Sequence, residues 1–408
     1  MTVLLETPQA PAVAGKAKAV VMRAPAVARW RIDSIDLLRG VIMLLMALDH
    51  TRDFFGPGGM DVRNVADPGL FLTRWITHFC APLFIFLAGT SACLYGTRDR
   101  TVGEVSRFLL TRGLWLIVIE FTVVRLGWTF SVDLEFFAAQ VIWALGACMV
   151  ALAGLVYLPR WAIAAVALAM IGGHNLLDGI RAEQLGAASW LWTILHERGL
   201  LQLGTDTKLY VLYPLVPWIG VMAAGYALGP VFKLAPAARR RWLLGLGAFT
   251  SAGFIVLRAL NVYGDPAPWV AQDNGLATLL SFLNCEKYPP SLLYLAMTLG
   301  PGLLLLAAFE HARGWLADAI TTYGRVPFFY YVLHIFVIHA LAVAFAWLTV
   351  GHAAWLFGGP PIAKPPNYGL SLPGVYLVWL LVILVLYPAC RWFSSIKQRR
   401  REWWWSYL

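Results

Sequence analysis

Charged residues and cysteines are scarce in this sequence. Of its 408 residues only 13% are charged, whereas 60% are hydrophobic, and the mean hydropathy is +0.67. Soluble globular proteins are about one quarter charged and about one half apolar, so this composition excludes a soluble cytoplasmic enzyme and a disordered chain. The five cysteines are odd in number and scattered, so they predict neither a disulfide framework nor a metal site.

Long apolar segments dominate the chain instead. A helix needs about 20 apolar residues to cross the hydrocarbon of a membrane. Ten segments approach that length: 34–55, 70–95, 105–127, 135–157, 160–178, 208–230, 241–262, 288–309, 326–349 and 372–393. We therefore predict an all-α polytopic integral membrane protein of about ten transmembrane helices. We expect a flexible basic tail at 1–30, the helical domain at 31–395 and a basic, aromatic tail at 396–408.

Basic residues account for the net charge of +10. They gather at the chain ends and in alternate loops, around Arg98, Lys233 and Lys397, whereas the loops between carry mainly acids. Basic loops stay on the cytoplasmic side of a membrane, so we predict that both termini are cytoplasmic. This orientation explains the excess of basic residues, so we expect contact with membrane lipid and no nucleic-acid partner. The location that we expect is a bacterial inner membrane.

The first apolar segment also contains ionisable residues, which are unfavourable within a membrane and indicate function by default. They are Asp36, Arg39, Asp49, His50 and Asp53. On a helix, Arg39 and His50 lie within roughly 20° of the same face and about 16 Å apart along the axis. The structural alternative is a boundary ion pair between Asp36 and Arg39 with an interfacial histidine.

Further ionisable residues fall at the level that we predict to be the outer half of the membrane. They are Arg74, His78, Glu120, Arg258, Lys287 and His334, and we expect them to line a polar chamber. His339 is more simply a packed histidine bonded to a carbonyl. The sequence contains neither H-x-x-x-H nor H-E-x-x-H, so we expect no metal. Acid–base catalysis by a histidine remains, or a proton-coupled permease for an anionic or sugar-linked solute.

Several motifs resemble a known family. Arg39 and His50 match the R-x10-H signature of transmembrane acyltransferases, within RIDSIDLLRG (31–40) and ALDHTRDFF (47–55). PLVPWIGVM (214–222), NVYGDP (261–266), KYPPS (287–291) and GRVPFFYYVLH (324–334) extend the likeness. Together these strings are similar to the bacterial relatives of heparan-α-glucosaminide N-acetyltransferase.

The resemblance implies that cytoplasmic acetyl-CoA, as acyl donor, gives its acetyl group to an amine or hydroxyl on the outer side. The acceptor is a small molecule or glycan, usually a sugar. His50 is then the general base or a transient acyl carrier, and Asp49 or Asp53 is a candidate for orienting its ring. Arg39 suits the phosphates of coenzyme A. The oligomeric state stays open, with a homodimer as one option.

Overall fold

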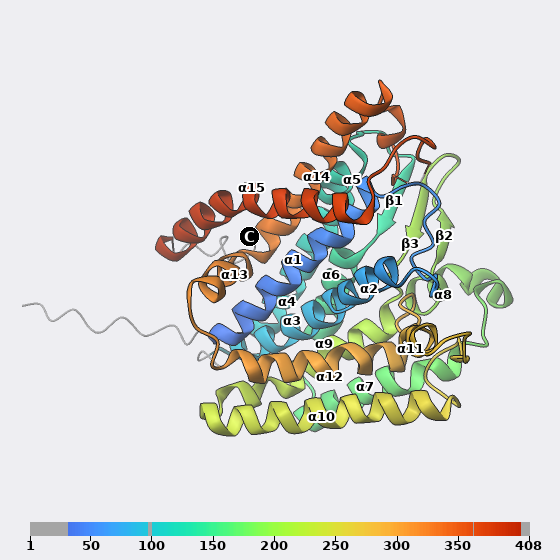
Figure 1. Cartoon of the computed structure of the whole chain (residues 1–408). Helices are drawn as coiled ribbons and strands as arrows, with labels where there is room; N and C mark the ends of the chain where they lie inside the picture. Colours follow the sequence, from blue (N-terminus) through green and yellow to red (C-terminus); the bar gives the residue numbers. More distant parts are fainter. Residues whose placement is uncertain (1–31, 97–99, 362, 401–408) are drawn as a thin grey trace, which may run out of the picture. The chain divides into compact units, whose positions relative to one another are not determined.

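The computed structural model describes residues 32–96, 100–361 and 363–400, and in these residues the chain is mainly helical (Figure 1). The predicted tail at 1–30 and residues 401–408 of the second tail lie outside the described residues. In the described part of the second tail, α15 continues to Arg399. Lys397 and Arg399 occupy its last turn, where positive charge is favourable. The longer helices are α1 (Asp33–Phe55), α3 (Cys80–Gly96), α4 (Val102–Ile119), α6 (Val141–Leu155), α7 (Arg160–Gly173), α9 (Leu215–Leu228), α10 (Pro236–Leu260), α12 (Leu292–Phe309), α14 (Pro327–Val350) and α15 (Leu372–Arg399).

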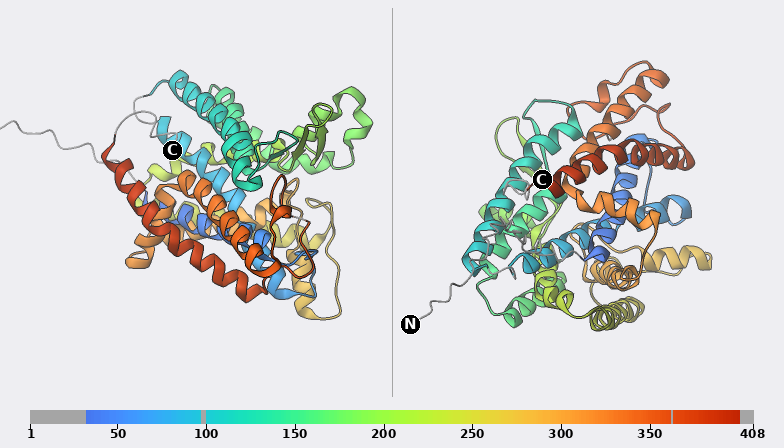
Figure 2. Two further views of the ribbon diagram at one scale, coloured as in Figure 1. Left: turned by 90° about the horizontal axis from the view of Figure 1, so that it is seen from above. Right: turned by 90° about the vertical axis from the view of Figure 1, so that its left-hand side faces the viewer.

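Shorter elements connect these helices. They are α2 (Pro68–Thr77), α5 (Arg125–Thr129), α8 (Ser189–Leu195), α11 (Gly275–Leu283) and α13 (Trp315–Arg325), the π-helix η1 (Glu120–Val124), and the 3₁₀ turns η2 (His174–Leu177), η3 (Ala182–Ala188), η4 (Gly229–Lys233) and η5 (Ala354–Leu356). Three short strands, β1 (Phe136–Ala139), β2 (Gly199–Gln202) and β3 (Lys208–Val211), form a sheet in the order β1-β3-β2. Strand β3 is parallel to β1 and antiparallel to β2, and this sheet lies with α8 at one end of the bundle (Figure 2).

The predicted fold class, an all-α polytopic membrane protein, is confirmed, but fewer than ten segments of the described residues meet the length and apolar composition of a membrane span. Within the described residues, seven helical segments are long and apolar enough to cross a membrane. They are Pro68–Gly96, Arg160–Leu177, Leu215–Lys233, Pro236–Leu260, Leu292–Phe309, Pro327–Val350 and Leu372–Arg399. The other three expected spans also form helices, but α1 and α4 carry several charges, and α6 has only 15 residues.

Helix α1 is the central helix among its neighbours. Most of its residues are buried, on all sides, and it packs against α2, α3 and α12 to α15 (Figures 1 and 2). Two glycines allow the close approach of α1 and α13: a Cβ atom at Gly324 would lie 1.7 Å from the Asp36 carbonyl oxygen, and one at Gly40 would lie 2.1 Å from that of Ile320. Small residues of this kind are typical of helix contacts in membranes.

Local capping signals determine where several helices begin. Asp67 accepts a hydrogen bond from the Leu70 amide at the start of α2, and Pro68 follows it. At the start of α12, Ser291 accepts from the Tyr294 amide. Both residue types satisfy free amides at helix starts. These two helix starts matter for function because Thr77 of α2 and Lys287, in the turn before α12, both contact Asp49 near the end of α1.

Candidate functional site

Two histidines meet at the end of α1. The Nδ1 atom of His50 lies 2.8 Å from Nε2 of His334 on α14, and the two rings are stacked with centroids 4.9 Å apart. His334 is fully buried, whereas His50 keeps 9% of its surface exposed. The Nδ1 atom of His334 lies 2.9 Å from the carbonyl oxygen of Tyr330, one turn earlier on α14.

These contacts determine which nitrogen of each neutral ring carries its proton. A carbonyl oxygen only accepts, so Nδ1 of His334 is the donor to Tyr330 and its Nε2 is an acceptor. Nδ1 of His50 must then donate to His334. The Nε2 atom of His50 is therefore left with a free lone pair, which is the arrangement that a general base needs.

Aromatic side chains surround this histidine pair. The indole of Trp128 on α5 meets the His50 ring edge-on, with centroids 4.8 Å apart, and the Tyr331 ring lies 6.3 Å away. On the other side, Tyr330 stacks on His334 at 5.2 Å. These walls restrict the orientation of both imidazoles and exclude water from the shared hydrogen bond.

Asp49 does not hold the imidazole of His50. Its Oδ1 atom pairs with Arg52 at 2.7 Å and accepts a hydrogen bond of 2.9 Å from the Thr77 hydroxyl on α2. Its Oδ2 atom lies 4.0 Å from Nζ of Lys287. The ring of His50 contacts His334, whereas the carboxylates of Asp49 and Asp53 pair with Arg52. Asp49 is the neighbour of His50 on α1 and points about 100° away from it around the helix.

Asp53 takes part in the same charge cluster. Its carboxylate accepts a hydrogen bond of 2.9 Å from Arg52. Its carbonyl oxygen and that of Gly56 accept hydrogen bonds of 2.6 and 2.7 Å from Nζ of Lys364. Burial lowers the pKa of Lys364, which lies in the loop before α15, to about 8. Lys364 thus satisfies the last carbonyls of α1, a role that no signal in the sequence indicated.

A tight turn presents Lys287 to Asp49. The preceding Glu286 accepts two hydrogen bonds from Arg63, at 2.7 and 2.8 Å, and accepts from the Lys287 and Tyr288 amides. Asp265 accepts from the Glu286 amide and from the Ser291 hydroxyl at the end of the turn. The position of Lys287 therefore depends on two buried or half-buried acids rather than on a helix.

Arg39 and Asp36 lie near the other end of α1. Nη1 of Arg39 is 3.3 Å from Oδ1 of Asp36, and Nη2 donates to the Leu87 carbonyl and the Ser91 hydroxyl on α3. The Arg39 side chain is 20% exposed. The predicted boundary pair of Asp36 and Arg39 is thus present.

Arg74 and His78 flank Thr77, which binds Asp49, so both reach the same end of α1. Arg74 is 8% exposed. The His78 ring contacts the Tyr294 ring edge-on at 5.2 Å, and neither of its nitrogens has a hydrogen-bond partner among the described residues. These two side chains agree with the predicted polar chamber, although their roles stay predictions.

Two predicted chamber residues have their charged groups bonded elsewhere. Glu120, in the π-turn, accepts a hydrogen bond of 2.7 Å from the Trp143 amide and so caps the start of α6. The guanidinium of Arg258 donates to four carbonyls in the segment 267–284 and is fully occupied by that loop. His339 is the packed histidine that we expected, because its Nδ1 atom lies 2.8 Å from the Gly127 carbonyl oxygen.

A family model described as "Heparan-alpha-glucosaminide N-acetyltransferase, catalytic" matches residues 31–263, which is more than half of the chain. The match extends from the start of α1 to just past the end of α10 and includes Arg39 and His50. Lys287 and His334 lie beyond it. No curated protein matches the sequence.

The Arg63–Glu286 pair predicts a pH-dependent stability. Although partial burial raises the pKa of Glu286, the hydrogen bonds and charge of Arg63 lower it below its usual range overall. A lowered pKa in the folded state adds stability above the ordinary pKa of about 4.3, which is lost as pH falls through the lowered value. Arg63→Gln should therefore cost about 1 kcal/mol at neutral pH, because the pair is half exposed.

The measurement is the difference in melting temperature between wild type and Arg63→Gln in detergent, from neutral pH down to about pH 3. We expect the difference to shrink towards zero at the acid end. Arg181→Gln, which breaks the more exposed pair with Glu197, serves as the matched control and should change the melting temperature less. A constant difference over the whole range would contradict an ionic origin.

Proposed function

The chain belongs to the heparan-α-glucosaminide N-acetyltransferase family of membrane acetyltransferases, and we propose that it transfers an acetyl group across the membrane. The donor is acetyl-CoA on the cytoplasmic side, and the acceptor is an amine or hydroxyl, of a sugar, on the outer side. The protein is an integral membrane protein, and we place it in a bacterial inner membrane. In this proposal the membrane separates the donor from the acceptor, and α1 extends from Arg39 on the donor side to His50 on the acceptor side.

The observation that carries this proposal is the 2.8 Å contact between Nδ1 of His50 and Nε2 of His334, which leaves Nε2 of His50 as the nitrogen with a lone pair. In the reaction, Nε2 takes the proton from the acceptor N–H or O–H while the acceptor atom attacks the thioester carbonyl carbon. The C–S bond then breaks, and the coenzyme leaves as a thiol with the proton that the imidazolium returns. The hydrogen bond from Nδ1–H of His50 to His334 holds the ring throughout both steps.

A two-step route through His50 is the chemical alternative within the same site. Nε2 would attack the thioester carbonyl, and the C–S bond would break with the coenzyme leaving as a thiolate. The acetyl group would then pass from the imidazole to the acceptor, and the proton that the acceptor loses would neutralise the thiolate. Both routes use the same nitrogen and the same tautomer. Initial-rate kinetics separate them, because the two-step route gives ping-pong patterns.

Arg39 is our proposed contact for the donor. Arg39 lies about 16 Å along α1 from His50, and its planar guanidinium suits phosphate groups. Asp36 and the α3 contacts would hold it in position. We assign Arg74, His78 and Lys287 to the acceptor side because they gather near His50 with Asp49.

His50→Ala should lower kcat by about 10²–10⁴, the usual contribution of a positioned general base. The measurement is transfer of labelled acetyl groups from acetyl-CoA to a panel of amino sugars by the protein in liposomes. His352→Ala, at an exposed position in the loop after α14, is the matched control and should keep full activity. Normal transfer by folded His50→Ala would remove His50 from the chemistry, whereas solute uptake without acetyl transfer would favour a permease.

His334 is a positioning residue, and its role can be separated from simple packing. His334→Ala removes the acceptor for Nδ1–H of His50, so we expect a fall in kcat. In His334→Gln an amide oxygen can accept the same hydrogen bond, and we expect most of the lost activity to return. Equal losses in the two variants, at equal melting temperatures, would contradict the positioning role.

Arg39→Lys tests the donor side. Lysine keeps the charge but loses the planar fork of donors, so the KM for acetyl-CoA should rise while the KM for the acceptor stays nearly constant. Kinetics with each substrate varied in turn provide the measurement. A rise confined to the acceptor KM, or a lower melting temperature with both KM values unchanged, would assign Arg39 to the acceptor or to packing.

A further inference from the structure

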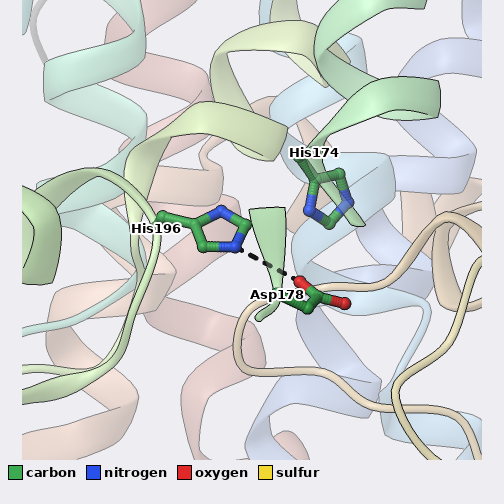
Figure 3. Close-up of side chains that lie close together, drawn as sticks. All are labelled: His174, Asp178 and His196. Carbon is green, nitrogen blue, oxygen red and sulfur yellow. Dashed lines mark ion pairs between the residues drawn. The ribbon is translucent and has the colours of Figure 1, made fainter. Parts of the chain in front are cut away.

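A second cluster of histidines lies outside the site around His50. His174, Asp178 and His196 each offer one ligand atom, and these three atoms lie within 4.8 Å of one another (Figure 3). The closest pair is Nε2 of His196 and Oδ1 of Asp178, at 3.2 Å. Both histidines are nearly inaccessible, with 2% and 3% of their surface exposed. The proposed acetyl transfer uses none of the three.

The ring nitrogens of both histidines are buried, and none makes a hydrogen bond of good geometry among the described residues. Two polar groups do lie beside them, the Asp178 carboxylate at 3.2 Å from Nε2 of His196 and the Pro290 carbonyl near His174. Buried polar atoms are nearly always satisfied in folded proteins. Buried ring nitrogens without a well-formed hydrogen bond, beside a carboxylate, therefore indicate that a ligand belongs between them.

The local fold brings the three side chains together. Helix α7 ends at Gly173. His174 is the first residue of the η2 turn that follows, and Asp178 comes directly after that turn. His196 comes directly after α8, where Trp192 packs on its ring with centroids 4.9 Å apart. The sequence contains the spacing of His174 and Asp178 as H-x-x-x-D. This spacing differs from the paired-histidine motifs H-x-x-x-H and H-E-x-x-H, whose absence led us to expect no metal.

The carboxylate is also oriented as a metal ligand would be. Its Oδ2 atom accepts a hydrogen bond of 2.8 Å from the side-chain amide of Asn175, and Oδ1 points to His196. Such second contacts are typical of metal-ligating carboxylates. Ligand atoms bound to zinc at about 2.0–2.2 Å lie roughly 3.3 Å apart in a tetrahedron, close to the observed His196–Asp178 distance.

We propose that His174, Asp178 and His196 bind a zinc ion. Two neutral imidazoles and one carboxylate are ligands that zinc favours, and a water molecule completes the tetrahedron. The ion would join the end of α7 to the end of α8. Through Asn175, whose side-chain oxygen accepts from the Leu292 amide at the start of α12, it would also stabilise the turn that contains Lys287.

The test is the zinc content of the full chain, purified with a tag that contains no histidine and measured by mass spectrometry. We expect about one zinc per chain in wild type, and at least tenfold weaker zinc binding in His196→Ala and Asp178→Asn. His352→Ala is the matched control and should keep its zinc. His50→Ala should keep zinc while losing acetyl transfer, so failure of the metal site and failure of the proposed activity are distinguishable.

A second measurement tests the metal site in the wild-type protein and therefore does not depend on the folding of the variants. Wild-type protein freed of zinc and titrated with Co²⁺ should develop the visible absorption of a tetrahedral site, and added zinc should remove that absorption. Zinc should also raise the melting temperature of wild type but not that of Asp178→Asn. The proposal is overturned if wild type binds no stoichiometric zinc or cobalt, or if His196→Ala and Asp178→Asn bind as tightly as His352→Ala.

Discussion

The burial of a charged helix in the centre of the bundle is the constraint on which the rest of the structure depends. Helix α1 carries six aspartate and arginine side chains, and most of its surface is covered by other helices. Charges are tolerated in such surroundings only when they are paired and hydrogen-bonded. Each end of α1 therefore requires partners from elsewhere in the chain: Ser91 on α3, Thr77 on α2, and Lys287 and Lys364 from loops.

The same constraint explains why His50 is available for chemistry. The acids next to it in the sequence are already neutralised by Arg52 and Lys287, so they do not compete for its ring. Its one ring partner is His334, a neutral acceptor that is itself held by a carbonyl. The result is an imidazole with a determined tautomer and one free nitrogen, in a site walled by aromatic rings. The close approach of α1 and α13 at Gly40 and Gly324 leaves little freedom for this arrangement to shift.

Much of the fold could be predicted because hydropathy and helix length are local properties. The all-α class follows from the requirement that a membrane-spanning backbone bonds within itself. Seven described segments meet the length and composition of a span, whereas the sequence suggested ten. The difference arises because α1, α4 and α6 are apolar on average, although α1 and α4 carry several charges and α6 is short. The sequence also singled out His50 and Arg39 as candidates, since their spacing on one helix face and a family signature pointed to the same residues.

The sequence by itself determined that this is a polytopic membrane protein and that its first helix carries several ionisable residues. It also identified His50 and Arg39 as the candidates for catalysis and for donor binding. Only the tertiary structure decided which polar groups meet. His50 and His334 are 284 residues apart, and Asp49 is bound by residues of α2 and of the turn before α12. His174, Asp178 and His196 come together only because the tertiary fold brings the turn after α7 close to the end of α8. The physical reason is that hydropathy and helical periodicity act over a few turns, whereas a buried charge or imidazole is satisfied by any group that packing brings to it.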